Sequence, residues 1–114
     1  MENKEIIENL IQHCRNGAWN EAQDELFAQD AISVELAENG TTKGLESIKK
    51  KADWFAENFE VHSIQVSDPL IAGDTFAIRI SLDTTNKKDG KRTPMDELCV
   101  YEIRNGKIIS ERFF

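Results

Sequence analysis

Apolar residues in the first half of the chain recur at intervals of three and four, which is the spacing of one helix face. This pattern predicts helices over residues 6–14, 19–27 and 44–59. Asn16-Gly17 lies between the first two and is typical of a helix end. We therefore expect three amphipathic helices, each with one apolar stripe that faces a core.

In the second half, apolar and polar residues alternate, as they do in strands with one buried face. Four strands are expected there, and a shorter strand precedes the third helix. The expected strands cover residues 31–36, 61–67, 75–83, 95–103 and 107–114. Glu38-Asn39-Gly40 is a turn signal, and Asn105-Gly106 is the strongest hairpin dipeptide in the chain. This order of elements indicates an α+β protein rather than alternating βα units.

A pocket is the natural consequence of this arrangement. A twisted antiparallel sheet wraps around the helices that cover its concave face. The space left between the two layers is the usual place for a ligand. We expect residues 1–114 to form a single domain of this kind.

Charge and composition narrow the possible partners. The chain carries 21 acidic and 14 basic residues, a net charge of −7, which disfavours nucleic-acid binding. No apolar run has the length of a membrane helix, so no membrane partner is expected. The charged N-terminus is followed by no apolar signal segment, which predicts a cytoplasmic protein. Cys14 and Cys99 both lie in apolar stretches, which predicts two reduced thiols rather than a disulfide.

No cofactor or metal is expected. The sequence has neither a Cys-x-x-Cys nor a His-x-x-x-His pair, and it has no phosphate-binding loop or dinucleotide fingerprint. The Gly-x-Ser-x-Gly elbow of serine hydrolases is missing as well. Lys49-Lys50-Lys51 is a short basic run on the third helix, which we interpret as a solvated face.

Three segments together carry a resemblance to a known family: Phe27-Ala28-Gln29-Asp30-Ala31 before a short strand, Gly44-Leu45-Glu46-Ser47-Ile48, and the run from Val100 to Ile108. Their order and spacing resemble the SnoaL-like polyketide cyclase group of the nuclear transport factor 2-like superfamily, over nearly the whole chain. The resemblance implies a cone-shaped, cystatin-like α+β barrel, with three N-terminal helices packed on a curved antiparallel sheet. It also implies a homodimer with a small-molecule pocket.

The same resemblance leaves two functions open, because this fold carries many activities. One is a cofactor-free isomerase, cyclase or lyase that works by proton transfer in an apolar pocket. The other is a non-catalytic module for ligand binding or dimeric association.

Strand register decides which side chains reach the pocket. If Asn105-Gly106 forms a two-residue turn, Cys99 pairs with Arg112 and the two share a face. A bulge would reverse the faces of the partner strand. Similarity to the ketosteroid isomerases implies that Glu97, Cys99 and Tyr101 point inward, with Arg112 opposite.

The isomerase comparison places a general base at Glu35. A carboxyl in an apolar pocket has a raised pKa and acts near neutral pH. The alternative is an exposed glutamate on a strand edge. The isomerase tyrosine aligns roughly with Leu10, and Cys99 replaces its neutral acid, so the isomerase oxyanion hole is missing.

Besides Glu35 and Cys99, the candidate set has five residues. His62 is a base or hydrogen-bond donor, or else a structural histidine. Glu97 with Arg112 is a substrate-orienting pair, or else a structural ion pair. Tyr101 offers a hydroxyl to the ligand, or else packs in the core. Trp54 is off the apolar stripe of its helix, which predicts a place in a lid, a pocket mouth or a dimer contact.

Overall fold

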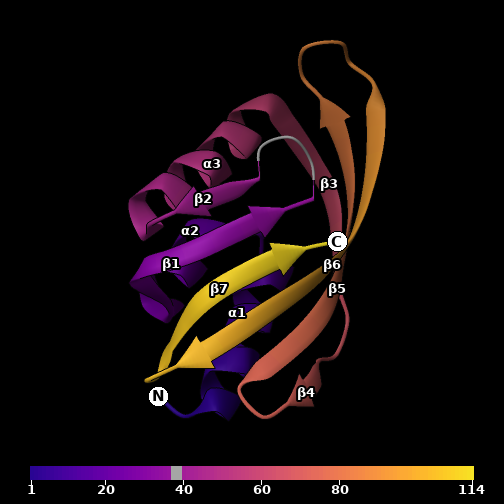
Figure 1. The fold of residues 1–114 in the computed structure, drawn as a ribbon. Helices are drawn as coiled ribbons and strands as arrows, with labels where there is room; N and C mark the ends of the chain where they lie inside the picture. The colour runs from indigo at the N-terminus through magenta and orange to yellow at the C-terminus, as the bar shows by residue number, and fades with distance from the viewer. Residues whose placement is uncertain (37–39) are drawn as a thin grey trace.

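A computed structural model describes residues 1–36 and 40–114 of the protein (Figure 1). Its elements in chain order are α1 (Asn3–Arg15), α2 (Trp19–Leu26), β1 (Phe27–Glu35), β2 (Thr41–Lys43), α3 (Leu45–Asn58), β3 (Phe59–Val66), β4 (Leu70–Ala72), β5 (Thr75–Asn86), β6 (Arg92–Arg104) and β7 (Lys107–Phe113). Of the turn expected at Glu38-Asn39-Gly40, only Gly40 lies within the described residues. None of the described helices has the length and apolarity needed to span a membrane.

The strands form one seven-stranded sheet in the order β2-β1-β7-β6-β5-β3, with β4 paired to β5. Figure 1 shows α1, α2 and α3 together on one face of this curved sheet. The expected α+β architecture of helices on a curved sheet is therefore confirmed. Two details differ: β1 pairs with β7 in parallel, and the described sheet stays open with β2 and β3 at its edges.

The second helix is shorter than expected, and the strand after it is longer. Phe27 ends α2 with extended backbone angles, φ −90° and ψ 144°. It then pairs with Ile108 of β7 and is only 4% exposed. The strand expected to begin at residue 31 therefore begins at 27, because pairing with a distant strand overrides the local helical spacing.

The core lies between α1 and the concave face of the sheet. Its α1 side is the predicted stripe, formed by Ile6, Ile7, Leu10, Ile11 and Cys14. Across from it, the rings of Phe76 and Tyr101 stack with centroids 5.0 Å apart. Cys14 and Cys99 are both buried, and no disulfide joins them.

A bulge in the β6–β7 hairpin changes the expected register. Arg104 pairs with Lys107 as a two-residue turn requires, but the register then shifts by one residue. The resulting pairs are Cys99 with Phe113, Val100 with Arg112, Tyr101 with Glu111 and Glu102 with Ser110. The expected pairing of Cys99 with Arg112 is therefore wrong. The concave face receives Glu111 instead, and Arg112 turns outward.

The turn of this hairpin depends on Gly106, whose φ is +76°. We expect Gly106→Ala to lower the free energy of unfolding by about 1 kcal/mol, because L residues are strained at this φ. An added Cβ would meet the Met1 carbonyl oxygen at 3.6 Å, an ordinary contact, so the loss is conformational. Urea unfolding measures it, with the exposed Ser47→Ala as control. Equal midpoints for the two variants would contradict the expectation.

Candidate functional site

A cavity of about 370 Å³ lies between α2, α3 and the concave face of the sheet. This is a volume suited to a small organic molecule. Its walls are mostly apolar and aromatic, formed by Leu10, Trp19, Phe27, Ile48, Ala52, Trp54, Phe55, Ile80, Leu82, Met95, Tyr101 and Phe113. Both tryptophans of the chain are among them.

Polar side chains enter this cavity from five different elements. They are Gln23 of α2, Glu35 of β1, Lys51 of α3, Glu97 of β6 and Glu111 of β7. Three of the five are carboxyls and one is a cation. In the described part of the chain, no group of three or more His, Cys, Asp or Glu is placed to hold a metal ion.

A short relay links the cation to the deepest carboxyl. The Lys51 ammonium donates a hydrogen bond to Ser33 Oγ at 2.6 Å, and Ser33 Oγ donates to Glu111 Oε2 at 2.7 Å. Lys51 Nζ also lies 3.5 Å from Glu35 Oε1. The same ammonium lies over the Phe113 ring, 5.5 Å from its centroid. Lys51 therefore interacts with Glu35 directly, with Glu111 through Ser33, and with the ring of Phe113.

The pKa of Glu111 is raised to about 7. The main cause is burial, since the residue is only 5% exposed and charge is disfavoured in an apolar site. The hydrogen bond from Ser33 and the charge of Lys51 oppose this rise, whereas the neighbouring Glu35 and Glu97 add to it. Near neutral pH the carboxyl is therefore present in both its acid and its base form.

The pKa values of Glu97, Tyr101 and the two thiols are also shifted in the direction that favours the neutral form. Burial and the charge of Glu35 raise the pKa of Glu97, against the effect of Lys51. Burial raises the pKa of Tyr101 well above its ordinary value, so its phenol stays neutral. The pKa of the Cys14 thiol is raised to about 12 by burial and by Glu111. Burial likewise raises the pKa of the Cys99 thiol.

The structure brings four of the sequence-predicted residues together at the cavity: Glu35, Trp54, Glu97 and Tyr101. Trp54 is 55% exposed and stacks edge-on against Phe59, with centroids 6.2 Å apart, which places it at the mouth. Cys99 shares the concave face but is fully buried and does not line the cavity.

Two predicted residues lie elsewhere. His62 is exposed on β3, with Nε2 2.7 Å from Thr85 Oγ1, and it does not line the cavity. Arg112 is exposed on the outer face of the sheet, opposite Val100, because of the bulge in β7. The expected inward pair of Glu97 and Arg112 is therefore not formed.

Sequence reasoning missed Glu111 and Lys51. A hairpin without a bulge puts Arg112 on the concave face and Glu111 on the outer one, so the expected register excluded Glu111 from the cavity. Lys51 was assigned to a solvated basic run, although it lies three residues after Ile48 and four before Phe55. That spacing puts it on the apolar face of the helix, and could have identified it as inward-facing.

Comparison with known proteins identifies the family and the fold. The profile of the SnoaL-like domain matches residues 1–114, whereas no curated protein matches the chain. A crystal structure from Mesorhizobium loti is 36% identical, with a TM-score of 0.94, and the match covers 100% of this chain and 99% of that one. That protein is provisionally described as a SnoaL-like polyketide cyclase, with carbohydrate phosphatase as a second designation.

Two further crystal structures share the fold at lower identity. An NTF2-like protein from Burkholderia thailandensis is 17% identical with a TM-score of 0.86, and the match covers 100% of this chain and 90% of that one. A Xanthomonas campestris protein of unknown function with a cystatin-like fold is 19% identical with a TM-score of 0.80, at the same coverage. The resemblance inferred from the sequence is confirmed, and the chain belongs to the SnoaL-like domain family.

Proposed function

We propose that the protein binds a small organic molecule in the cavity and moves a proton to or from it, with Glu111 as the acid–base group and without a cofactor. The observation that carries the proposal is the position of this carboxyl, buried in an apolar cavity with a pKa of about 7. A group with its pKa near the working pH is effective both as base and as acid. Isomerisation, cyclisation and elimination all need such a group.

The surrounding residues have separate roles in this proposal. Ser33 and Lys51 position Glu111 and set its ionisation through the relay of hydrogen bonds. Glu35, Glu97 and the neutral hydroxyl of Tyr101 orient the polar groups of the ligand. An excess of carboxylates repels phosphate, so the geometry favours cyclase-type chemistry over a phosphatase reaction.

The alternative is a binding module without catalysis. The feature that favours it is the missing pair of isomerase donors, since the corresponding residues are Leu10 and Cys99. Both are buried apolar or thiol side chains, and neither supplies a strong donor to an oxyanion. The alternative predicts ligand binding with no dependence of any reaction on Glu111.

The ring opening of 5-nitrobenzisoxazole distinguishes the two. A base removes the C–H proton, the N–O bond breaks, and a nitrile and a phenolate form, so no cofactor takes part. We expect a protein-dependent rate that rises through about pH 7 and falls about 100-fold or more in Glu111→Gln. The control is Glu102→Gln, which removes a carboxyl paired with Arg104 on the outer face.

Two results would contradict the proposal. One is a wild-type rate equal to that of the buffer, and the other is a rate that Glu111→Gln leaves unchanged. If the wild-type rate equals that of the buffer but the probe still alters tryptophan fluorescence, the binding module is the correct function, because Trp19 and Trp54 both line the cavity.

We further propose that the chain forms a homodimer through the outer face and edge of the sheet. Large apolar side chains are exposed there: Leu70 at 80%, Ile71 at 57%, Leu98 at 47% and Phe114 at 55%. Such residues commonly mark a protein interface. Sedimentation should give a dimer for the wild type and a monomer for Leu98→Glu. A monomeric wild type would overturn the proposal.

A cytoplasmic location also remains a proposal. It is supported by Cys14 and Cys99, which are buried and unpaired. Reducing compartments keep cysteines in this state. Detection of the protein in an oxidising compartment would contradict it.

A further inference from the structure

The polar groups of the cavity are unbalanced in charge. Glu35, Glu97 and Glu111 supply three carboxyls, whereas Lys51 supplies the one ammonium among the described residues that line the cavity. The carboxyls already disfavour one another, because the charge of Glu35 raises the pKa of both other groups. A cation placed among them would remove this repulsion.

Lys51 does not balance the three carboxyls. Its ammonium is engaged with Ser33 Oγ at 2.6 Å and lies 3.5 Å from Glu35 Oε1. Its contact with Glu111 passes through the Ser33 hydroxyl rather than directly. Glu97 lines the cavity from β6, and its carboxylate has no hydrogen-bond or ion-pair partner among the residues that the structure describes.

Gln23 gives a second and independent indication. Its side chain lines the cavity from α2 and is only 8% exposed. The buried Oε1 atom has no hydrogen-bond partner among the described residues. A buried acceptor without a donor is unfavourable and uncommon in folded proteins. A donor on the ligand would satisfy it.

The walls of the cavity suit a cation with an apolar body. Aromatic rings from several elements surround it, including Trp19, Trp54, Phe55 and Phe113. The faces of such rings attract ammonium groups, and tryptophan does so most strongly. Lys51 already occupies one such position above Phe113, 5.5 Å from the ring centroid.

We infer that the ligand is an organic ammonium, a protonated primary or secondary amine attached to an aromatic or otherwise apolar group. This rests on the ligand cavity of the proposed function and adds the chemical class of the ligand. The N–H groups would donate to Gln23 and Glu97, and the apolar body would fill the aromatic part of the cavity. An anionic ligand would meet the carboxylates, and a neutral one would leave them uncompensated.

Three probes of matched shape test the inference: 2-phenylethylamine, 2-phenylethanol and phenylacetate. Calorimetry and tryptophan fluorescence measure their binding at about pH 8, where the amine is protonated and Glu111, whose pKa is about 7, is largely ionised. We expect the amine to bind about 10-fold or more tightly than the alcohol, and phenylacetate to bind most weakly.

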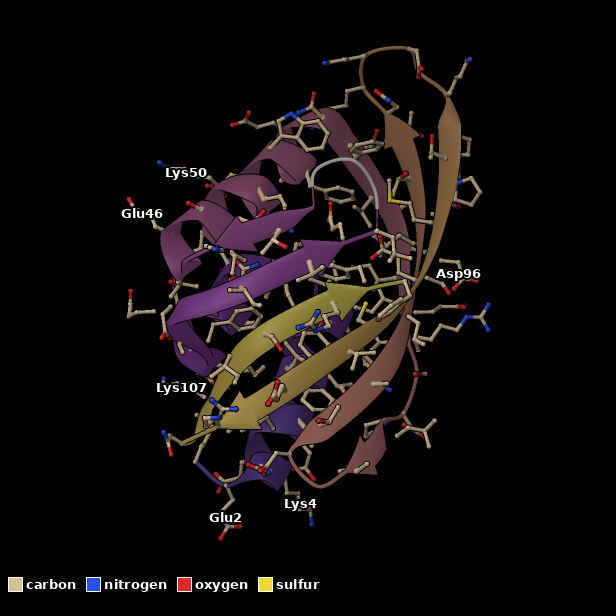
Figure 2. All side chains as sticks on the ribbon, in the orientation of Figure 1. Glu2, Lys4, Glu46, Lys50, Asp96 and Lys107 are labelled. Carbon is tan, nitrogen blue, oxygen red and sulfur yellow. The ribbon has the colours of Figure 1, made fainter. Side chains whose placement is uncertain are left out.

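Variants of two cavity residues test whether the preference for the amine over the alcohol arises in the cavity. Glu97→Gln and Gln23→Leu should each reduce amine binding about 10-fold and reduce alcohol binding less, since the alcohol is uncharged and has one O–H donor, whereas the ammonium donates to both acceptors. The matched control is Glu46→Gln, because Glu46 points away from the sheet on the outer side of α3 (Figure 2). It removes the same charge without touching the cavity.

Equal affinities for the amine and the alcohol, or binding of none of the probes, would overturn the inference. These outcomes are separate from a failure of the proposed function, which the Glu111-dependent opening of 5-nitrobenzisoxazole tests with an uncharged probe. An amine preference that survives both Glu97→Gln and Gln23→Leu would also overturn it, because the amine would then bind elsewhere.

Discussion

Replacing Glu111 with glutamine should remove a large part of the pH dependence of the protein's stability. The ordinary pKa of this carboxyl is 4.5, and it is about 7 in the folded protein. A carboxyl with a raised folded pKa contributes stability that is fully present below 4.5 and is lost as pH rises through about 7. The wild type should therefore lose about 3 kcal/mol of unfolding free energy across this range from Glu111.

Urea unfolding at a series of pH values measures this loss. Glu111→Gln stays neutral, so its stability relative to the wild type should increase by about 3 kcal/mol between about pH 4 and pH 8. Glu97 has a shift of the same sign, but it remains in both proteins and largely cancels in the difference. Glu46→Gln should run parallel to the wild type. A Glu111→Gln curve that is also parallel would show that Glu111 is not buried as described.

Replacing Lys51 with methionine should move the pH dependence of the reaction. The charge of Lys51 lowers the pKa of both Glu111 and Glu97, so its loss raises them. Removing a nearby opposite charge shifts a pKa by about one unit or more. With 5-nitrobenzisoxazole, Lys51→Met should be several-fold slower at about pH 7 and should recover at higher pH, once Glu111 ionises.

The control for this variant lies one residue away. Lys50 points outward from α3, on the side away from the sheet (Figure 2), so Lys50→Met should leave the profile unchanged. A uniform loss of rate in Lys51→Met, with the same midpoint as the wild type, would mean that Lys51 only supports the structure. A shifted midpoint is not expected from a merely structural role.

The sequence was most informative where one local pattern decides the structure. The apolar residues of α1 from Ile6 to Cys14 recur at helical spacing, and this local pattern agrees with the observed helix. The alternation in β5 likewise agrees with the observed burial of Phe76, Ile78 and Ile80. In both cases the residues of one segment determine which face is buried.

The sequence-based predictions were wrong where contacts between segments far apart in the chain determine the structure. Phe27 continues the helical spacing of α2, but its pairing with Ile108 makes it the first residue of β1. The alternation of β7 alone does not predict the bulge after Ile108. Because of this bulge, Glu111 rather than Arg112 lies on the concave face. A one-residue shift of register is therefore the reason why the proposed acid–base group could not be predicted from the sequence.

The proposed function requires a carboxyl at position 111 that titrates near neutrality inside the cavity. Carbon-13 NMR of the glutamate side-chain carboxyls follows each of them with pH, and the resonance missing from Glu111→Gln identifies the one in question. We expect a midpoint of about 7 for this resonance. A midpoint near the ordinary value of 4.5 would contradict it.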